Sequence, residues 1–203
     1  MSLKLKYNIS SYDRLRINFW GIPKCMNTAA KYALLHESGI IESNSELQET
    51  DIGVEYHKEN LNKYLDPKQA LENGYENVTI TRHPYGRVIS LYQDFGLRRK
   101  ASPIPHNCSF DEFIKFISKQ PVETQKANVH VRSQCYFITD SKDNILPENV
   151  LTVSNYPEFF ANRGIEIQVI NKTEQSNIIL TSEHKEIIRN VYHRDFQLLN
   201  FKG

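Results

Sequence analysis

The sequence has few cysteines, no long apolar stretch and almost no net charge, and each shortage excludes a class of protein. The three cysteines form no C-x-x-C pair, which argues against a disulfide framework or a zinc site and fits a reducing compartment. No apolar run approaches the roughly 18 residues of a membrane helix. The N-terminal MSLKLKYNISS lacks the apolar core of a signal peptide. We therefore expect a soluble, cytoplasmic protein that requires no metal.

The balance of charge limits the kinds of partner. The 25 basic and 24 acidic residues leave a net charge of +1, so no broad basic field indicates nucleic acid or an anionic membrane. An anionic ligand would have to be bound by a local cluster of donors. The sequence does not indicate an oligomeric state.

Length and patterning predict one α/β domain over residues 1–203. Hydrophobic residues make up 39% of the chain and charged residues 24%, as in globular proteins. Strand-like and helix-like segments alternate, which predicts a three-layer, P-loop-like fold with a central, mainly parallel sheet flanked by helices. Extended segments are expected at 16–22, 52–56, 77–81, 134–139, 149–153 and 165–170. Helices are expected at 28–37 and 67–73, and from Pro84, from Ser109 and from Thr181 or Ser182 onward.

A short loop between the first expected strand and an alanine-rich helix is the first candidate site. It consists of Pro23, Lys24, Cys25, Met26, Asn27 and Thr28. A strand, a loop with lysine and threonine, and then a helix present backbone N–H groups and a cation to a phosphate. In the common loop G-x-x-x-x-G-K-[ST] the lysine directly precedes the hydroxyl residue, whereas here it lies at the front of the loop. An ordinary strand-to-helix turn with a solvated lysine is an equally good interpretation of this loop alone.

The run RHPYGRVISLY is the second candidate. Arg82 ends an expected strand and can direct two N–H groups at a phosphate, and Ser90 adds a hydroxyl from the helix that follows. A capped helix with Arg87 in a surface ion pair is the alternative interpretation. Because both candidates follow strands of one expected sheet, together they suggest a nucleoside with a phosphate group at each end.

On these residues the chain resembles sulfotransferases that use 3′-phosphoadenosine 5′-phosphosulfate (PAPS), most closely the branch that modifies carbohydrates. The family's 5′-phosphosulfate loop is similar to residues 23–28, although Cys25, Met26 and Asn27 stand where small residues are usual. Its 3′-phosphate motif, R-x-P-x-x-R-x-x-S-x-Y, is matched by Arg82, Pro84, Arg87, Ser90 and Tyr92.

Two later segments extend the resemblance, which runs in ordered pieces from about residue 16 to residue 201 but is poor over residues 42–73. Lys172 and Thr173 resemble a segment near the nucleotide. The ending VYHRDFQLLNF resembles the family's closing helix. The resemblance implies sulfuryl transfer to an acceptor hydroxyl of a carbohydrate, with 3′-phosphoadenosine 5′-phosphate (PAP) as the nucleotide product and no metal.

The resemblance also implies roles for single residues. Lys24 would stabilise charge on the oxygen between phosphate and sulfate, Thr28 would bind the 5′-phosphate, and Arg82 and Ser90 would bind the 3′-phosphate. His57 follows an expected strand where related enzymes place a general base, with Glu55 and His130 as alternatives. His130 and Gln134 resemble a family segment that faces the acceptor.

Two other functions remain open at this point. A small-molecule kinase or NTPase would also use a phosphate loop, but it should carry a lysine directly before Thr28 and a clear Mg²⁺-binding aspartate. A non-catalytic nucleotide-binding module is the second alternative, against which Lys24 argues.

Overall fold

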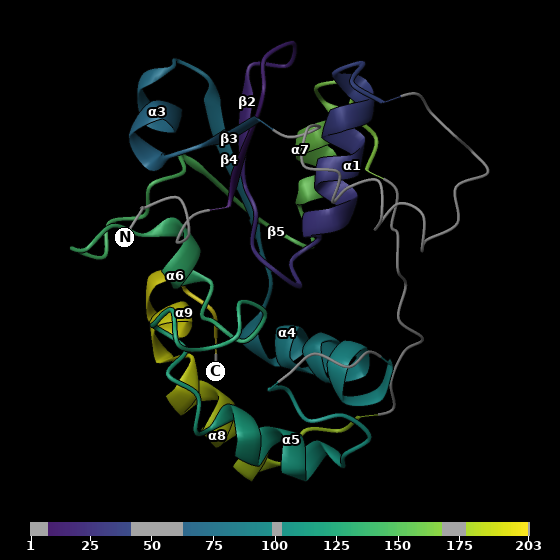
Figure 1. Ribbon diagram of the computed structural model, residues 1–203, viewed down its shortest axis with the longest axis vertical. Helices are drawn as coiled ribbons and strands as arrows, with labels where there is room; N and C mark the ends of the chain where they lie inside the picture. The colour runs from purple at the N-terminus through teal and green to yellow at the C-terminus, as the bar shows by residue number, and fades with distance from the viewer. Residues whose placement is uncertain (1–7, 42–62, 99–102, 168–177, 203) are drawn as a thin grey trace. The chain divides into compact units, whose positions relative to one another are not determined.

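The computed structural model describes residues 8–41, 63–98, 103–167 and 178–202 (Figure 1). The chain forms two compact units, each described here by itself. The first comprises residues 1–81 and 146–172, and the second comprises residues 82–145 and 173–203. The prediction of one sulfotransferase-like domain over residues 1–203 stays a prediction.

The first unit contains a five-stranded sheet with the order β3-β1-β2-β4-β5. Its strands are β1 (Ile9–Tyr12), β2 (Ile17–Trp20), β3 (Lys63–Leu65), β4 (Glu76–Thr81) and β5 (Asn149–Thr152). β2, β4 and β5 run parallel, whereas β1 is antiparallel to both β2 and β3. The expected mainly parallel sheet is therefore a mixed one, because β1 forms a hairpin with β2 and also pairs antiparallel with β3.

The alternation of residues along β2 explains how this sheet is covered. Ile17 and Phe19 point into the apolar core formed with α1 (Asn27–Glu37) and α7 (Tyr156–Ala161). Asn18 points to the other face, where its amide donates to the Ala70 carbonyl (2.8 Å) in α3 (Pro67–Glu72). Figure 1 accordingly shows α1 and α7 on one side of the sheet and α3 on the other.

The second unit is helical around its own apolar core. Its elements are α4 (Pro84–Leu91), the π-helical stretch η2 (Tyr92–Arg98), α5 (Phe110–Ile117), α6 (Cys135–Ile138), α8 (Ser182–Val191) and α9 (His193–Leu198). Pro84 occupies the first turn of α4 and Ser109 caps α5 in a capping box with Glu112, both as predicted. The last helices contribute Ile188, Tyr192 and Phe196 to this core.

Two expected strands are wrong over their described parts. Within residues 134–139 only Thr139 is extended. Residues 135–138 form the helix α6, because the backbone N–H groups of Gln134 and Cys135 donate to the buried Asp195 carboxylate. Residues 165–167 are irregular, and the Ile165 N–H bonds back to the Phe160 carbonyl at the end of α7. Short apolar runs of this kind do not distinguish a buried strand from a helix. The strand expected at 52–56 lies outside the described residues.

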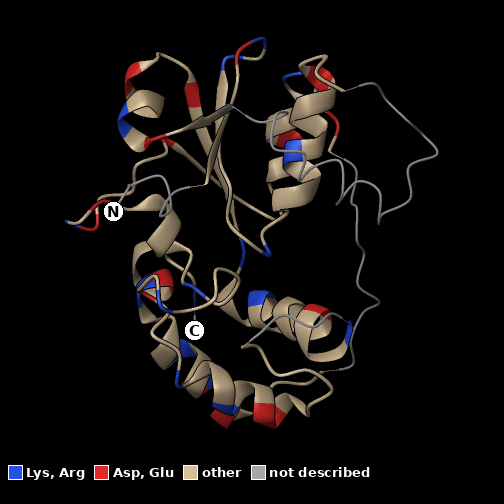
Figure 2. Ribbon diagram, in the orientation of Figure 1, with Lys and Arg blue, Asp and Glu red and all other residues tan. Residues whose placement is uncertain are grey.

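Basic and acidic residues are not separated along the described chain. Figure 2 shows basic and acidic residues mixed along the ribbons of both units. Among the described residues, no helix is both long and apolar enough to cross a membrane.

Candidate functional site

The loop at residues 23–28 connects β2 to α1 in the first unit. The Cys25 N–H donates to the Ile22 carbonyl (3.2 Å) and closes a turn. Lys24 and Met26, on either side of Cys25, have left-handed backbones with φ of 69° and 58°. Left-handed non-glycine residues cost roughly 1–2 kcal/mol each and concentrate at functional sites. Backbone turned in this way forms concavities lined by N–H groups that bind anions.

The start of α1 lacks the side-chain cap that the comparable helices have. Met26 precedes it in a left-handed conformation and makes no capping hydrogen bond. The other described helices of eight or more residues begin at a capping side chain, from His83, Ser109 or Thr181. The first amides of α1 therefore make no hydrogen bond to a capping side chain, and they lie at the positive end of the helix dipole. This is the arrangement in which a helix binds phosphate.

Gly21 allows the side chain of Asn27 to reach the base of the loop. A Cβ atom on Gly21 would overlap Asn27 Oδ1 and lie 2.8 Å from Asn8 Nδ2, so a larger residue would have to displace these side chains. Asn27 Oδ1 is buried and has no hydrogen-bond partner among the described residues. A buried acceptor without a donor is costly unless something else supplies one.

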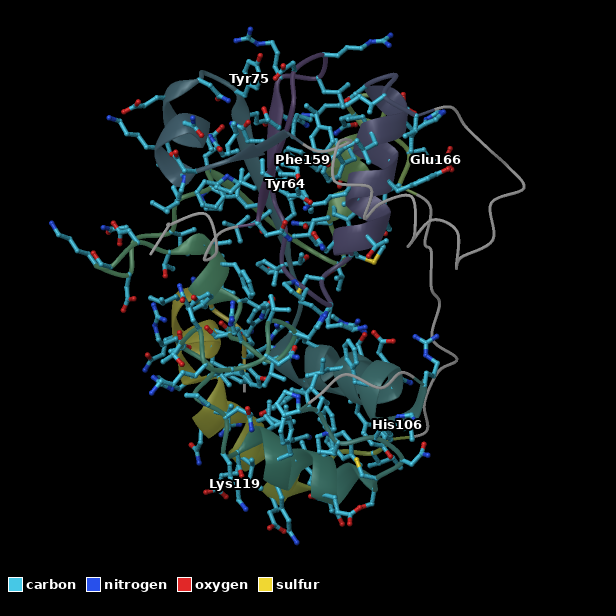
Figure 3. The ribbon with its side chains drawn as sticks, viewed as in Figure 1. Tyr64, Tyr75, His106, Lys119, Phe159 and Glu166 are labelled. Atoms are coloured by element: carbon cyan, nitrogen blue, oxygen red, sulfur yellow. The ribbon has the colours of Figure 1, made fainter. Side chains whose placement is uncertain are left out.

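A buried lysine, absent from the sequence-based site, supports the loop from one turn further along α1. Lys31 is fully buried, and its Nζ donates to Asn8 Oδ1 (2.7 Å). Asn8 in turn holds Gly21, whose N–H donates to the Asn8 carbonyl (2.8 Å) and whose carbonyl accepts from Asn8 Nδ2 (3.3 Å). Burial lowers the pKa of Lys31 from 10.5 to about 7. Its ammonium lies 5.1 Å from the ring centroid of Tyr64, which is labelled in Figure 3.

Arg82 follows β4 and belongs to the second unit. Its backbone is held by Gln134, whose Oε1 accepts from the Arg82 N–H (2.8 Å) and whose Nε2 donates to the Arg82 carbonyl (2.8 Å). Its guanidinium lies against the first turn of α4, since a Cβ atom on Gly86 would be 3.3 Å from Arg82 Nε. Ser90 is four residues beyond Gly86 and therefore on the same helix face. The structure thus associates Arg82 and Ser90 with one face of α4.

Arg87 has a different environment from the surface ion pair considered above. It is buried, and its Nη2 donates to the carbonyls of His130 (3.3 Å) and Arg132 (2.7 Å). Arg87 therefore ties α4 to the segment that carries His130. The His130 ring packs against Phe95 with a centroid separation of 4.6 Å.

The roles of the remaining predicted site residues stay predictions. His57, Glu55, Lys172 and Thr173 lie outside the described residues, so their roles stay predictions. Gln134 is fully buried behind Arg82, and its contact with an acceptor likewise stays a prediction.

Burial raises the pKa of the Cys135 thiol and, to a smaller extent, that of Cys108. Such thiols are poor nucleophiles at neutral pH. No group of three or more His, Cys, Asp or Glu side chains within the described ranges could hold a metal ion.

Comparison with known proteins gives a match to a protein family. The model of the sulfotransferase family matches residues 8–145, a span that includes the loop, Arg82, Ser90, His130 and Gln134. No curated protein and no solved structure matches the chain.

Proposed function

The chain belongs to the sulfotransferase family, and we propose that it transfers a sulfuryl group from PAPS to a hydroxyl group of a carbohydrate. One observation carries the proposal. Within the matched region, the parallel strands β2 and β4 end at the same edge of the sheet, one before an uncapped helix and the other before a supported arginine. Ligands of open α/β sheets bind beyond such strand ends.

The loop residues suit the 5′-phosphosulfate end of PAPS, which supplies the sulfuryl group. Pro23, Cys25 and Met26 shape the loop backbone, and the N–H groups of Asn27 and Thr28 together with the Thr28 hydroxyl bind the 5′-phosphate. Lys24 offers a cation to the charge that develops on the oxygen between phosphate and sulfate. The left-handed backbone at Lys24 and the uncapped start of α1 support this assignment.

Arg82 and Ser90 bind the 3′-phosphate, the group that separates PAPS from ATP. A guanidinium matches a phosphate with two parallel N–H bonds, and the buried position of Ser90 on the same helix face supports the pairing. Lys172 and Thr173 are proposed to contact the same nucleotide.

His57 is the proposed general base, with Glu55 and His130 as alternatives, and His130 and Gln134 are proposed acceptor contacts. A base of this kind contributes about 10²–10⁴-fold to the rate. Turnover of His57→Ala, Glu55→Gln and His130→Ala, each compared at saturating PAPS, identifies which residue holds this role. The base variant should lose turnover while its affinity for PAP is unchanged.

Thermal unfolding with nucleotides tests the donor assignment. At 100 times its Kd a ligand stabilises a protein by about 2.7 kcal/mol, so PAP should raise Tm clearly, whereas ATP with Mg²⁺ should not. Stabilisation by ATP with Mg²⁺ alone would instead favour the kinase alternative. Transfer of label from PAPS to a panel of glycans then separates an enzyme from a binding module, and a non-carbohydrate alcohol in the panel tests the acceptor class.

A further inference from the structure

Both backbone polar groups of Arg82 are bound by a single buried side chain. The Gln134 amide accepts from the Arg82 N–H and donates to the Arg82 carbonyl, each at 2.8 Å. Arg82 follows the last residue of β4, where the ladder of sheet hydrogen bonds stops. Backbone groups left unpaired at such a point are costly. Gln134 therefore fixes the main chain from which the Arg82 side chain extends.

Gln134 is itself fixed by Asp195, which is fully buried in α9. Asp195 Oδ2 accepts from the Gln134 backbone N–H (3.0 Å) and from Gln134 Nε2 (3.3 Å). Its Oδ1 accepts from the Cys135 N–H (2.9 Å). A buried carboxylate with three donors is both satisfied and restricted to one orientation. A continuous chain of hydrogen bonds thus runs from Asp195 through Gln134 to Arg82.

The far end of the Arg82 side chain is restricted by Gly86. A Cβ atom at residue 86 would lie 3.3 Å from Arg82 Nε, which is closer than a Cβ atom normally approaches another atom. It would lie 3.9 Å from Arg82 Nη2, which is an ordinary contact. The missing side chain lets the guanidinium lie against the first turn of α4. Within a helix, glycine costs about 0.5–1 kcal/mol of stability relative to alanine. We therefore expect Gly86 to provide a benefit that offsets this cost, namely space for the Arg82 guanidinium.

We propose that Gln134, Asp195 and Gly86 are positioning residues that aim the Arg82 guanidinium, and that selectivity for a 3′-phosphorylated nucleotide depends on them. The inference rests on the proposed function, because it takes Arg82 to bind the 3′-phosphate. An arginine that is free to rotate must lose much of its rotamer entropy when it forms a two-point contact. Fixing its backbone and its guanidinium in advance removes part of that cost.

The test is the ratio of the Kd of 5′-AMP to the Kd of PAP, measured by calorimetry. This ratio isolates the contribution of the 3′-phosphate to binding. A general loss of stability would not change the ratio as long as the variant is folded. We expect the wild-type protein to prefer PAP, and Gly86→Ala and Gln134→Met each to reduce the ratio about tenfold with little change in the Kd of 5′-AMP. Gly86→Ala should also unfold at the same or a higher Tm, since alanine favours the helix.

Two controls separate positioning from structural damage. Gln120→Met removes a hydrogen bond from Gln120 Nε2 to the Phe116 carbonyl (3.3 Å) in the same unit and should leave the ratio unchanged. In an Arg82→Ala background, Gly86→Ala should have no further effect on the ratio, because the two residues would act through the same guanidinium.

The possible outcomes decide the inference. If Gln134→Met does not fold, Gly86→Ala alone decides. The inference would be overturned, and the proposed function left intact, if Gly86→Ala kept the wild-type preference for PAP and Gln134→Met, where it folds, kept it too. The same conclusion would follow if Gly86→Ala changed the Kd ratio in the Arg82→Ala background as well. A wild-type protein that does not distinguish PAP from 5′-AMP would overturn the proposed function and the inference with it.

Discussion

The loop at residues 23–28 and the turn at Arg82 both follow strands of the same sheet, yet they are prepared for anions in opposite ways. The loop relies on its backbone, with left-handed residues at Lys24 and Met26 and a helix start that no side chain caps. The Arg82 turn relies on a side chain, and α4 behind it is capped by His83, whose Nδ1 accepts from the Tyr85 N–H (3.3 Å). In the loop no side chain caps the first helix amides, whereas at the turn the Tyr85 amide is bonded to His83.

The two regions also differ in the buried residue that supports each of them through hydrogen bonds. A buried lysine, Lys31, reaches the loop through Asn8, and a buried aspartate, Asp195, reaches the turn through Gln134. A backbone site should keep its affinity for an anion when a side chain changes, as long as the conformation survives. A side-chain site depends on residues far along the chain. Substitutions should therefore have different consequences in the two regions.

The largest expected effect is on turnover, from Lys24→Ala in the loop. Loss of a cation that stabilises transition-state charge should reduce kcat by about 10²–10³. The fold should persist, because alanine can replace lysine in a partly buried loop. Steady-state rates with PAPS and thermal unfolding measure the two quantities.

Lys24→Gly is the matched variant for this prediction. Glycine adopts a φ of 69° without strain, so this variant should be about 1 kcal/mol more stable than Lys24→Ala while losing turnover equally. Near-normal turnover in either variant would refute the role of Lys24, and equal stability would refute the strain. Either result would weaken the contrast between a strained loop and a relaxed turn.

The second prediction concerns pH and the buried Lys31. Its pKa is lowered to about 7 in the folded protein, whereas the unfolded chain keeps the ordinary value of 10.5. Between these values the unfolded state binds more protons, so the free energy of unfolding should rise with pH. From pH 7 to pH 9 the wild-type protein should gain about 2 kcal/mol relative to Lys31→Met. Below pH 7 the difference between the two should become constant.

Denaturant unfolding of both proteins across this pH range measures the effect. Lys68→Met is the control, because Lys68 is exposed on α3, with 80% of its side chain accessible, and should not change the slope. Parallel stability curves for the wild-type protein and Lys31→Met would show that Lys31 keeps its charge when buried. The buried support of the loop would then be a charged group.

The local signals in the sequence located most elements and both candidate anion sites. Pro84 and the pair Ser109 and Glu112 predicted helix starts because those residues act on their nearest neighbours. The parallel strands β2, β4 and β5 lie within a residue or two of their predicted bounds, since buried strands are continuous apolar runs. The short edge strand β3 was missed because its pairing partner, β1, is distant in sequence.

The buried residues that support the two sites could not be predicted, because their hydrogen-bond partners are also distant in the sequence. Lys31 looks like an ordinary helix lysine, and only its partner Asn8, 23 residues away, shows why it is buried. Gln134 reaches Arg82 across 52 residues, and Asp195 reaches Gln134 across 61. Periodicity and spacing carry no information on such pairs. The resemblance to the family covers the closing helix that contains Asp195, but it does not give the partners of that residue.

The smallest expected effect is on the stability of the turn, from His83→Ala. The His83 ring accepts from the Tyr85 N–H, and its Nε2 bonds to the Lys202 carbonyl (2.8 Å). His83→Asn should keep the cap that His83→Ala removes, so the two variants should differ by about 1 kcal/mol in the free energy of unfolding. Both lose the ring contacts, which makes the difference specific to the cap. If the turn binds through a side chain held by Gln134, neither variant should change the preference for PAP over 5′-AMP. A reduced preference that follows the loss of the cap would mean that the amides of α4 also bind the anion, and the turn would then resemble the loop.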